Sequence, residues 1–256
     1  VQSQGDGRLR VEFRLWDVFG EGQLEGQVYT AQAASWRRIA HIMADEIYKR
    51  LTGENGYFDS RIVYVAESGP DIKRIKRLAI MDQDGENHKF LTDGRYLVLT
   101  PRFSPNYKSI LYLSYQDGNP RIYVYDIDSG RQRLITQSRN PTFAPRWSPD
   151  GQTILYSMAV AGNTDVYKVS ASGGAPVRLT TAPGIDVGGS FSPDGRQIVF
   201  ESDRGGSQQI YIMNTDGSSQ RRISYGGGRY ATPEWSPRGD LIAYTRIAGD
   251  FRVGVM

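Results

Sequence analysis

The chain has 256 residues, a formal net charge of +3 and no cysteine. Without cysteine there are no disulfides, thiolate metal sites or cysteine nucleophiles. The 31 basic residues are mixed with 28 acidic ones, so we expect no nucleic-acid partner. No run of ~18 apolar residues occurs, so we expect no direct membrane insertion. The 29 glycines and 12 prolines are typical of many short strands joined by turns.

The beginning of the chain predicts a pair of strands. Val11, Phe13 and Leu15 alternate with charged residues, which is typical of a half-buried strand. Gly20–Gly22 favours a turn, and Gln23–Tyr29 is expected to return as the second strand.

A helix is predicted over Trp36–Leu51, with Ser35 as its N-cap and Gly53 as its C-terminal stop. Its apolar side chains share one face at the helical period, and they are Trp36, Ile39, Ala40, Met43, Ile47 and Leu51. We interpret residues 1–56 as the C-terminal part of a small α/β domain. Its core is too small to stand alone, so we expect further sequence before Val1 in the natural protein.

The rest of the chain repeats with a period of 44 residues. An aromatic-Ser-Pro motif marks each repeat, at Phe103-Ser104-Pro105, Trp147-Ser148-Pro149, Phe191-Ser192-Pro193 and Trp235-Ser236-Pro237. A Leu/Ile-Thr/Ser pair keeps the same period, at Leu91-Thr92, Ile135-Thr136, Leu179-Thr180 and Ile223-Ser224. Several features in one register predict a repeat architecture, and a period of ~40–50 residues with four short strands is typical of a β-propeller blade.

Each repeat divides into strands A to D. Strand A ends at the aromatic-Ser-Pro motif, and strands B, C and D are expected near Ile198–Phe200, Ile210–Met213 and Arg222–Ser224 in the fourth blade. A Pro-Asp-Gly turn joins strands A and B in the third and fourth blades. In the second blade Tyr107 stands where Gly stands later, so either this turn differs or Tyr107 carries backbone strain of order 1 kcal/mol or more.

We assign residues 57–256 to a mainly-β propeller of about five blades, truncated at its C-terminus. No aromatic-Ser-Pro strand precedes blade one, and Met256 lies within strand C of blade five. Propellers are usually closed rings, because open sheet edges invite aggregation. We therefore expect the natural protein to continue beyond Met256.

The segment that joins the two parts resembles the TolB family of periplasmic propeller proteins. The matching residues are Val11–Leu15, Ala40-His41, Asp45-Glu46-Ile47-Tyr48, Leu51-Thr52-Gly53, Gly56, Phe58 and Arg61-Ile62-Val63-Tyr64-Val65. This resemblance implies an N-terminal α/β domain, six blades in the parent and a place in the Tol–Pal system of the periplasm. It implies the lipoprotein Pal as a partner of the propeller, and TolA as a partner of an N-terminus that lies outside this chain. We expect a monomer.

The resemblance implies that Pal binds the propeller face formed by the connections from strand D to strand A. These connections are expected at Arg95–Thr100, Arg139–Ala144, Ala182–Val187 and Gly228–Thr232. The candidate partner-binding residues are Arg102, Arg139, Thr142, Phe143, Ala144, Arg146, Asp186, Val187, Arg229, Tyr230 and Glu234. Of these, Arg102, Arg146 and Glu234 precede the motif aromatics, as Ser190 does, and are expected near the channel. The alternative is that each candidate is an ordinary polar loop residue. The motif aromatics are expected to pack between blades.

We expect no catalytic residues, metal or cofactor. The two histidines, His41 and His88, lie outside strand A, and no Gly-x-Ser-x-Gly nucleophile motif occurs. Asp82-Gln83-Asp84-Gly85 does not continue into a calcium-loop pattern and is interpreted as a turn. Two alternatives remain open: an accessory, substrate-gating propeller of a prolyl-oligopeptidase-type serine peptidase, since such propellers share the blade motif, and a propeller lyase or hydrolase with a metal in its channel.

Overall fold

The structure, a computed structural model, describes all residues from Val1 to Met256. The chain forms two compact units. The first is Val1–Ile62 with Ile80–Lys89, and the second is Val63–Ala79 with Phe90–Met256. The second unit holds most of the repeat.

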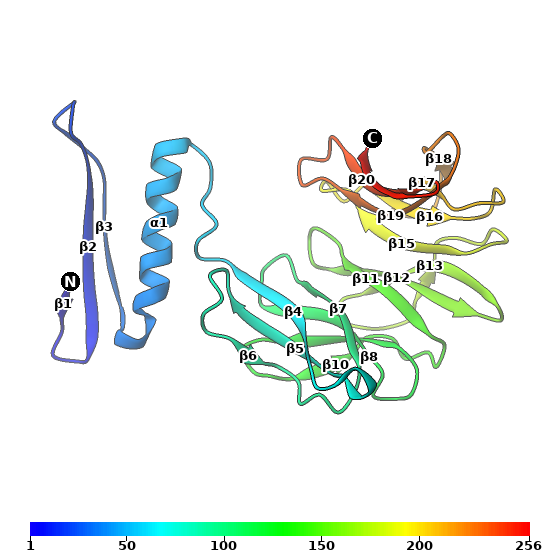
Figure 1. Ribbon diagram of the computed structural model, residues 1–256, viewed down its shortest axis with the longest axis horizontal. Coiled ribbons are helices and arrows are strands. Elements are labelled where there is room, and N and C mark those ends of the chain that lie inside the picture. Colours follow the sequence, from blue (N-terminus) through cyan, green and yellow to red (C-terminus); the bar gives the residue numbers. More distant parts are fainter. The chain divides into compact units, whose positions relative to one another are not determined.

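The first unit contains an antiparallel sheet of β1 (Gln2–Ser3), β2 (Arg8–Asp17) and β3 (Gly22–Gln32). The predicted strand pair is therefore confirmed, with longer strands than the alternation indicated (Figure 1). Val11 and Phe13 are buried, and the ring of Phe13 lies parallel to that of Tyr29 at 6.4 Å. This face of the sheet forms the core of the unit together with α1.

Helix α1 (Trp36–Thr52) follows a 3₁₀ turn, η1 (Ala33–Ser35). Gly53 ends the helix as expected, in the left-handed conformation that glycine adopts without strain. The predicted cap at Ser35 is wrong in one respect, since its side chain makes no capping bond. The preceding 3₁₀ turn places Ser35 at φ −91° and ψ 12°, outside the extended conformation that N-caps favour.

The apolar face of α1 is fully buried only at Ile39, near the start of the helix. Ile39 is 5% exposed, whereas Trp36 and Leu51 at the two ends are 56% and 64% exposed. The amino- and carboxyl-terminal turns of the helix therefore present apolar side chains to solvent.

The repeat forms five sheets, and the predicted order of strands A to D is confirmed (Figure 1). Blade one has no strand A and contains β4 (Arg61–Ser68), the 3₁₀ turn η2 (Asp71–Lys73), β5 (Ile75–Asp82) and β6 (Lys89–Phe90). Blade two contains β7 (Val98–Phe103), β8 (Ser109–Ser114), β9 (Arg121–Asp126) and β10 (Gln132–Leu134). Blade three contains β11 (Thr142–Trp147), β12 (Thr153–Val160), β13 (Asn163–Ser170) and β14 (Val177–Arg178).

Blade four contains β15 (Asp186–Phe191), β16 (Gln197–Ser202), β17 (Gln209–Asn214) and β18 (Arg221–Arg222). Blade five contains β19 (Arg229–Trp235), β20 (Ile242–Ile247) and β21 (Phe251–Val255). All pairs within blades two to five are antiparallel, and strand A lies at one edge of each sheet.

The repeated serine of the aromatic-Ser-Pro motif organises the turn from strand A to strand B. In blade four the Ser192 hydroxyl donates to the Asp194 carboxylate at 2.6 Å and accepts the Gln197 amide at 2.9 Å. The same pair of bonds recurs in the other complete turns, with Asn106, Asp150 or Asp240 as the acceptor. Because these hydrogen bonds stabilise the backbone of the turn, the position requires a small hydroxyl side chain.

A second repeated hydroxyl joins strands C and D. The Thr180 hydroxyl accepts the Val166 amide at 2.9 Å, and the Ser224 hydroxyl accepts the Ile210 amide at the same distance. Blade one has the same bond from the Leu78 amide. These bonds explain why a Leu/Ile-Thr/Ser pair keeps the 44-residue period.

Apolar clusters lie between neighbouring blades and form the core of the propeller unit. The cluster between blades three and four contains Leu155 and Leu179 from one blade and Ile198, Phe200 and Met213 from the other. The motif aromatics pack against such clusters, Trp147 between blades two and three, Phe191 between three and four, and Trp235 between four and five. The predicted packing between blades is therefore confirmed for these three aromatics.

Tyr107 adopts the backbone conformation of the glycines that replace it in later blades. Its φ is +58°, against +70° for Gly151 and Gly195. Its amide donates to the Ser104 carbonyl at 2.9 Å, as the Gly151 amide does to Ser148. The turn is therefore the same, and of the two alternatives the one with backbone strain at Tyr107 is correct.

Candidate functional site

Strand A of every blade that has one carries a bulge at the same place. The strand pairing shifts register between Leu99 and Arg102 in blade two and at the three equivalent places in the later blades. The residues at the centre of the bulges have φ between 48° and 68°, and they are Thr100, Ala144, Gly188 and Thr232. Each left-handed non-glycine residue costs ~1–3 kcal/mol, so the repeated bulge conformation lowers the stability of the folded protein.

Side chains from the preceding blade hold two of the bulges. The Gly188 amide donates to the Ser157 hydroxyl at 3.3 Å, and the Thr232 amide donates to a carboxylate oxygen of Glu201 at 3.0 Å. Glu201 is 6% exposed, and its other oxygen accepts the Gln208 amide group at 2.8 Å. Burial, together with the charge of Asp203, raises the pKa of the Glu201 carboxyl, while the two hydrogen bonds oppose the shift.

The predicted D–A connections are shorter than expected. All but one of the candidates placed in them lie in strand A itself, because the bulge lets each strand begin earlier than the sequence pattern indicated. Those in strands are Thr142, Phe143, Ala144, Asp186, Val187, Arg229 and Tyr230, and Arg139 alone precedes its strand.

Three of these candidates are buried, and their side chains bond to other groups of the protein. The Thr142 hydroxyl donates to the Pro120 carbonyl at 3.1 Å, and the Tyr230 hydroxyl donates to the Tyr225 carbonyl at 2.8 Å. Asp186 is fully buried and pairs with Arg204 at 2.7 Å. Arg139 and Arg229 are exposed, and Phe143, Ala144 and Val187 are partly exposed. Of the candidates at this end of the strands, these five side chains are accessible to a partner.

The remaining candidates lie at the opposite end of strand A, around a cavity of about 300 Å³. Arg146 pairs with Glu234 at 3.2 Å, and the Ser190 hydroxyl lies 3.4 Å from the other oxygen of Glu234. Arg102 lines the same cavity. Partial burial, and secondarily the charge of Arg146, lower the pKa of the Arg102 guanidinium, which nevertheless stays charged at any physiological pH.

The two groups of candidates are therefore separated along strand A. One group lies beside the bulges at the start of the strand, and the other lines the cavity at the turn into strand B. The motif aromatics Phe103, Trp147, Phe191 and Trp235 also line that cavity, and the last three pack between blades as well.

Comparison with known proteins decides the family. A family model described as the TolB beta propeller domain matches residues 48–256. The chain belongs to the TolB propeller family. The Tol-Pal system protein TolB of Paramagnetospirillum magneticum is 62% identical over 125 residues, which are 49% of this chain and 28% of that protein. The crystal structure of TolB from Acinetobacter baumannii is 32% identical, with a TM-score of 0.83 over 96% of this chain and 62% of that chain.

The chain thus spans less than two thirds of the length of either TolB protein. A puromycin-hydrolysing peptidase of Mycobacterium tuberculosis also matches, with a TM-score of 0.60 and 16% identity over 75% of this chain and 35% of that chain. At that level of identity the likeness shows the fold alone.

The other residues singled out in the sequence form ordinary polar contacts. His41 on α1 lies 3.2 Å from the Asp84 carboxylate, which also pairs with Arg37. The segment Asp82–Gly85 forms the predicted turn, in which the Gly85 amide donates to the Asp82 carbonyl at 3.0 Å. No group of three or more His, Cys, Asp or Glu side chains is arranged to hold a metal ion. No helix has the length and apolar character of a membrane span.

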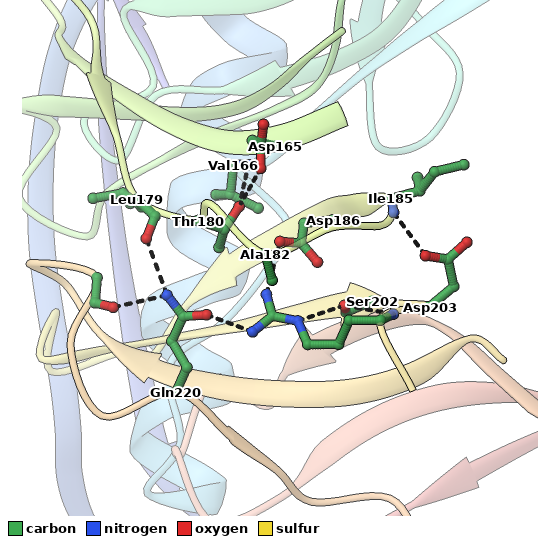
Figure 2. A network of polar contacts seen from close by, with 12 residues as sticks. Asp165, Val166, Leu179, Thr180, Ala182, Ile185, Asp186, Ser202, Asp203 and Gln220 are labelled. Carbon is green, nitrogen blue, oxygen red and sulfur yellow. Dashed lines mark hydrogen bonds and ion pairs between the residues drawn. The ribbon is translucent and has the colours of Figure 1, made fainter. Parts of the chain in front are cut away.

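Sequence reasoning missed the bulges and the surroundings of Arg204. The Arg204 guanidinium donates to Asp186 at 2.7 Å, to the Ser202 hydroxyl at 2.9 Å and to the Gln220 side chain at 2.7 Å. Figure 2 shows Asp186, Ser202 and Gln220 converging from separate segments of blade four. The guanidinium also lies over the rings of Phe200 and Tyr211, at 5.4 Å and 5.0 Å from their centres.

Proposed function

We propose that this chain is the propeller part of a non-enzymatic periplasmic scaffold of the Tol–Pal envelope system. Its partner at the start of strand A is the lipoprotein Pal, and TolA is contacted by a part of the protein outside this chain. The proposal draws on membership of the TolB family and on the Tol–Pal name of the relative from Paramagnetospirillum magneticum.

The observation that supports a binding site at the start of strand A is the series of strained bulges. Bulges re-aim side chains and are over-represented beside functional sites, and backbone strain persists only where the surroundings impose it. Here three non-glycine residues, Thr100, Ala144 and Thr232, keep a left-handed conformation at the same end of the propeller strands. At the cavity end only one lining residue, Tyr107, is strained in this way, and it lies in the turn from strand A to strand B, not in a repeated bulge.

The side chains beside the bulges suit a protein partner. Arg139 and Arg229 are exposed, and Phe143 and Val187 are partly exposed. Arginine and aromatic side chains are frequent anchors of protein interfaces, and they bind best where a partner removes water from them. We therefore expect the arginines to contribute to Pal binding, with Phe143 and Val187 supplying apolar contact.

Calorimetric titration of the full-length protein with the soluble domain of Pal tests the site. The double variant Arg139→Glu with Arg229→Glu reverses two exposed charges beside the bulges. The matched control is Arg146→Glu with Glu234→Arg, which exchanges the ion pair of the cavity and conserves net charge. We expect the first variant to weaken binding at least about tenfold and the second to leave it within about twofold.

The outcomes separate the function from the site. If the folded wild-type protein does not bind Pal, the scaffold proposal is wrong. If Pal binds and only the cavity variant weakens it, the scaffold stands but the site moves to the other end of strand A.

A further inference from the structure

Blade two and the segment that leads into it line a second cavity, of about 190 Å³, which none of the preceding functions uses. It is lined by Leu91, Thr92, Asp93, Tyr96, Val98, Tyr112, Ser114, Gln116 and Gln132. This volume far exceeds the ~10–15 Å³ that a single water needs. We propose that this cavity binds a guanidinium group, as carried by the side chain of an arginine.

The equivalent position in blade four shows which group fits the cavity. Positions 88 residues apart are equivalent in blades two and four, and the pairs are Leu91 and Leu179, Val98 and Asp186, Tyr112 and Phe200, Ser114 and Ser202, Gln116 and Arg204, and Gln132 and Gln220. In blade four these residues surround the Arg204 guanidinium or bond to the residues that do. In blade two the shorter Gln116 turns to the hydroxyl of Tyr123 at 2.7 Å. The place that Arg204 fills in one blade is thus hollow in the other.

Blade three shows that the hollow is not a general feature of the repeat. There the serine of the other two blades is replaced by Met158, which is 6% exposed and belongs to the apolar cluster between blades two and three. Blade two keeps the polar serine and the polar glutamine of blade four but has Gln116 in place of the arginine that bonds to both of them.

The cavity wall offers the acceptors that a guanidinium requires. The Ser114 hydroxyl accepts the Gln116 amide at 3.4 Å, as Ser202 accepts the amide of Arg204 at 3.3 Å, so the two serines have the same orientation. The side-chain oxygen of Gln132 accepts the Tyr112 hydroxyl at 2.7 Å and retains a second lone pair. Tyr112 also presents a ring at the place where Phe200 lies under Arg204, and arginine stacks on aromatic rings.

The cavity has less negative charge than the surroundings of Arg204, so we expect it to bind a guanidinium group more weakly. Val98 replaces the buried acid Asp186, so the only carboxylate of the cavity is Asp93. Asp93 is exposed and pairs with Arg95 at 3.0 Å, both side chains being largely in solvent. Exposed pairs of this kind contribute little, ~0–1 kcal/mol, so an incoming guanidinium can replace Arg95.

A titration of the whole chain with Nα-acetyl-arginine amide, followed by protein NMR shifts, tests the proposal. Nα-acetyl-lysine amide is the control ligand, since it carries the same charge without the planar fork. Gln116→Arg places the arginine of blade four in the cavity of blade two. Val160→Arg adds the same charge at the equivalent position of blade three, where Met158 leaves no room, and is the control variant.

We expect saturable binding of the arginine probe, at least about tenfold tighter than the lysine probe. The Gln116→Arg protein should lose this binding, and the Val160→Arg protein should keep it. Absence of saturable binding by the wild-type protein would overturn the proposal without any variant. Equal binding of the two probes, or unchanged binding by the folded Gln116→Arg protein, would overturn it as well.

Discussion

Blades three and four fill the same place in the repeat with opposite chemistry. In blade three the position carries the buried Met158, whereas blade four has Ser202 there and closes the space with the ion pair of Arg204 and Asp186. The backbone of the two blades is nevertheless equivalent, with the same bulge and the same strand order. The repeated hydroxyls and turns therefore determine the backbone of the blade. The side chains that occupy this position can differ from blade to blade.

The two fillings differ in how they respond to the loss of one member. A methionine that is truncated leaves an apolar cavity, but an arginine that is truncated leaves a buried charge. Asp186 is fully buried, and one of its oxygens has no hydrogen-bond partner even when Arg204 is present. The polar blade is therefore the more vulnerable of the two.

The largest expected loss of stability is that of the Arg204→Ala variant. The substitution leaves the Asp186 carboxylate buried without a cation and also uncovers the Phe200 ring. Breaking a buried pair in this way costs about 3–5 kcal/mol, so we expect a loss of that size in the free energy of unfolding. Urea denaturation of the wild-type and variant proteins at pH 7 measures it.

A variant that copies blade three into blade four is the control. It combines Asp186→Thr, Ser202→Met and Arg204→Val, so that no charge is left without a partner. Replacing a buried ion pair by apolar groups of similar volume is often neutral or stabilising, and we expect this protein to recover most of the stability lost in Arg204→Ala. If it is no more stable than Arg204→Ala, the two blades are not interchangeable at this place.

The parts of the fold that were predictable from the sequence are those that depend on local chemistry. Gly53 predicted the helix end because few other residues tolerate its φ of +79°. The Pro-Asp-Gly segments predicted the turn from strand A to strand B because proline and glycine favour turn conformations, and the motif serine adds hydrogen bonds to the neighbouring backbone. Such bonds lie within a few residues, so they are visible as a repeated pattern.

The parts that were missed depend on pairing between distant segments. Three of the four bulge residues are Thr or Ala, which give no sign of a positive φ. The bulge arises from the pairing of strand A with strand B, and its amide is held by the preceding blade, as for Thr232 and Glu201. Arg204 lies in a polar, glycine-containing turn whose sequence gives no sign of its contacts. Its partners Asp186 and Gln220 lie 18 and 16 residues away.

A smaller effect on stability is expected at the turn from strand A to strand B, where blade two has Tyr107 and blade four has Gly195. Tyr107 has a φ of +58° where Gly195 has +70°, and its exposed ring lies 5.9 Å from that of Phe103. Tyr107→Gly removes strain of ~1–2 kcal/mol but gives the unfolded chain more freedom, which costs ~0.5–1 kcal/mol. We expect a gain of at most about 1.5 kcal/mol, measured as a rise in thermal midpoint.

The complementary substitution, Gly195→Ala, separates strain from ring contact. A Cβ at this position meets only Pro149, at 4.0 Å, so the cost is that of the backbone alone. We expect a loss of about 1 kcal/mol. A neutral result in both variants would show that this turn accepts a left-handed alanine or tyrosine without strain.

The smallest expected effect is a pH dependence of stability at the bulges. Two side chains accept hydrogen bonds from bulge amides, Ser157 in blade three and Glu201 in blade four. Serine does not titrate, whereas burial raises the pKa of the Glu201 carboxyl above its ordinary value of 4.5. The folded protein therefore binds this proton more tightly than the unfolded chain does. Between pH 4.5 and the raised pKa, the contribution of Glu201 to stability must fall as pH rises.

Glu201→Gln removes this titration and serves to isolate it. We expect the difference in unfolding free energy, wild type minus variant, to be larger near pH 4.5 than at pH 7, measured by urea denaturation at both values. All other carboxylates are common to the two proteins and cancel in the difference. A difference that stays constant, or shrinks on acidification, would mean that the hydrogen bonds from Thr232 and Gln208 outweigh burial and hold the Glu201 carboxylate in its charged form.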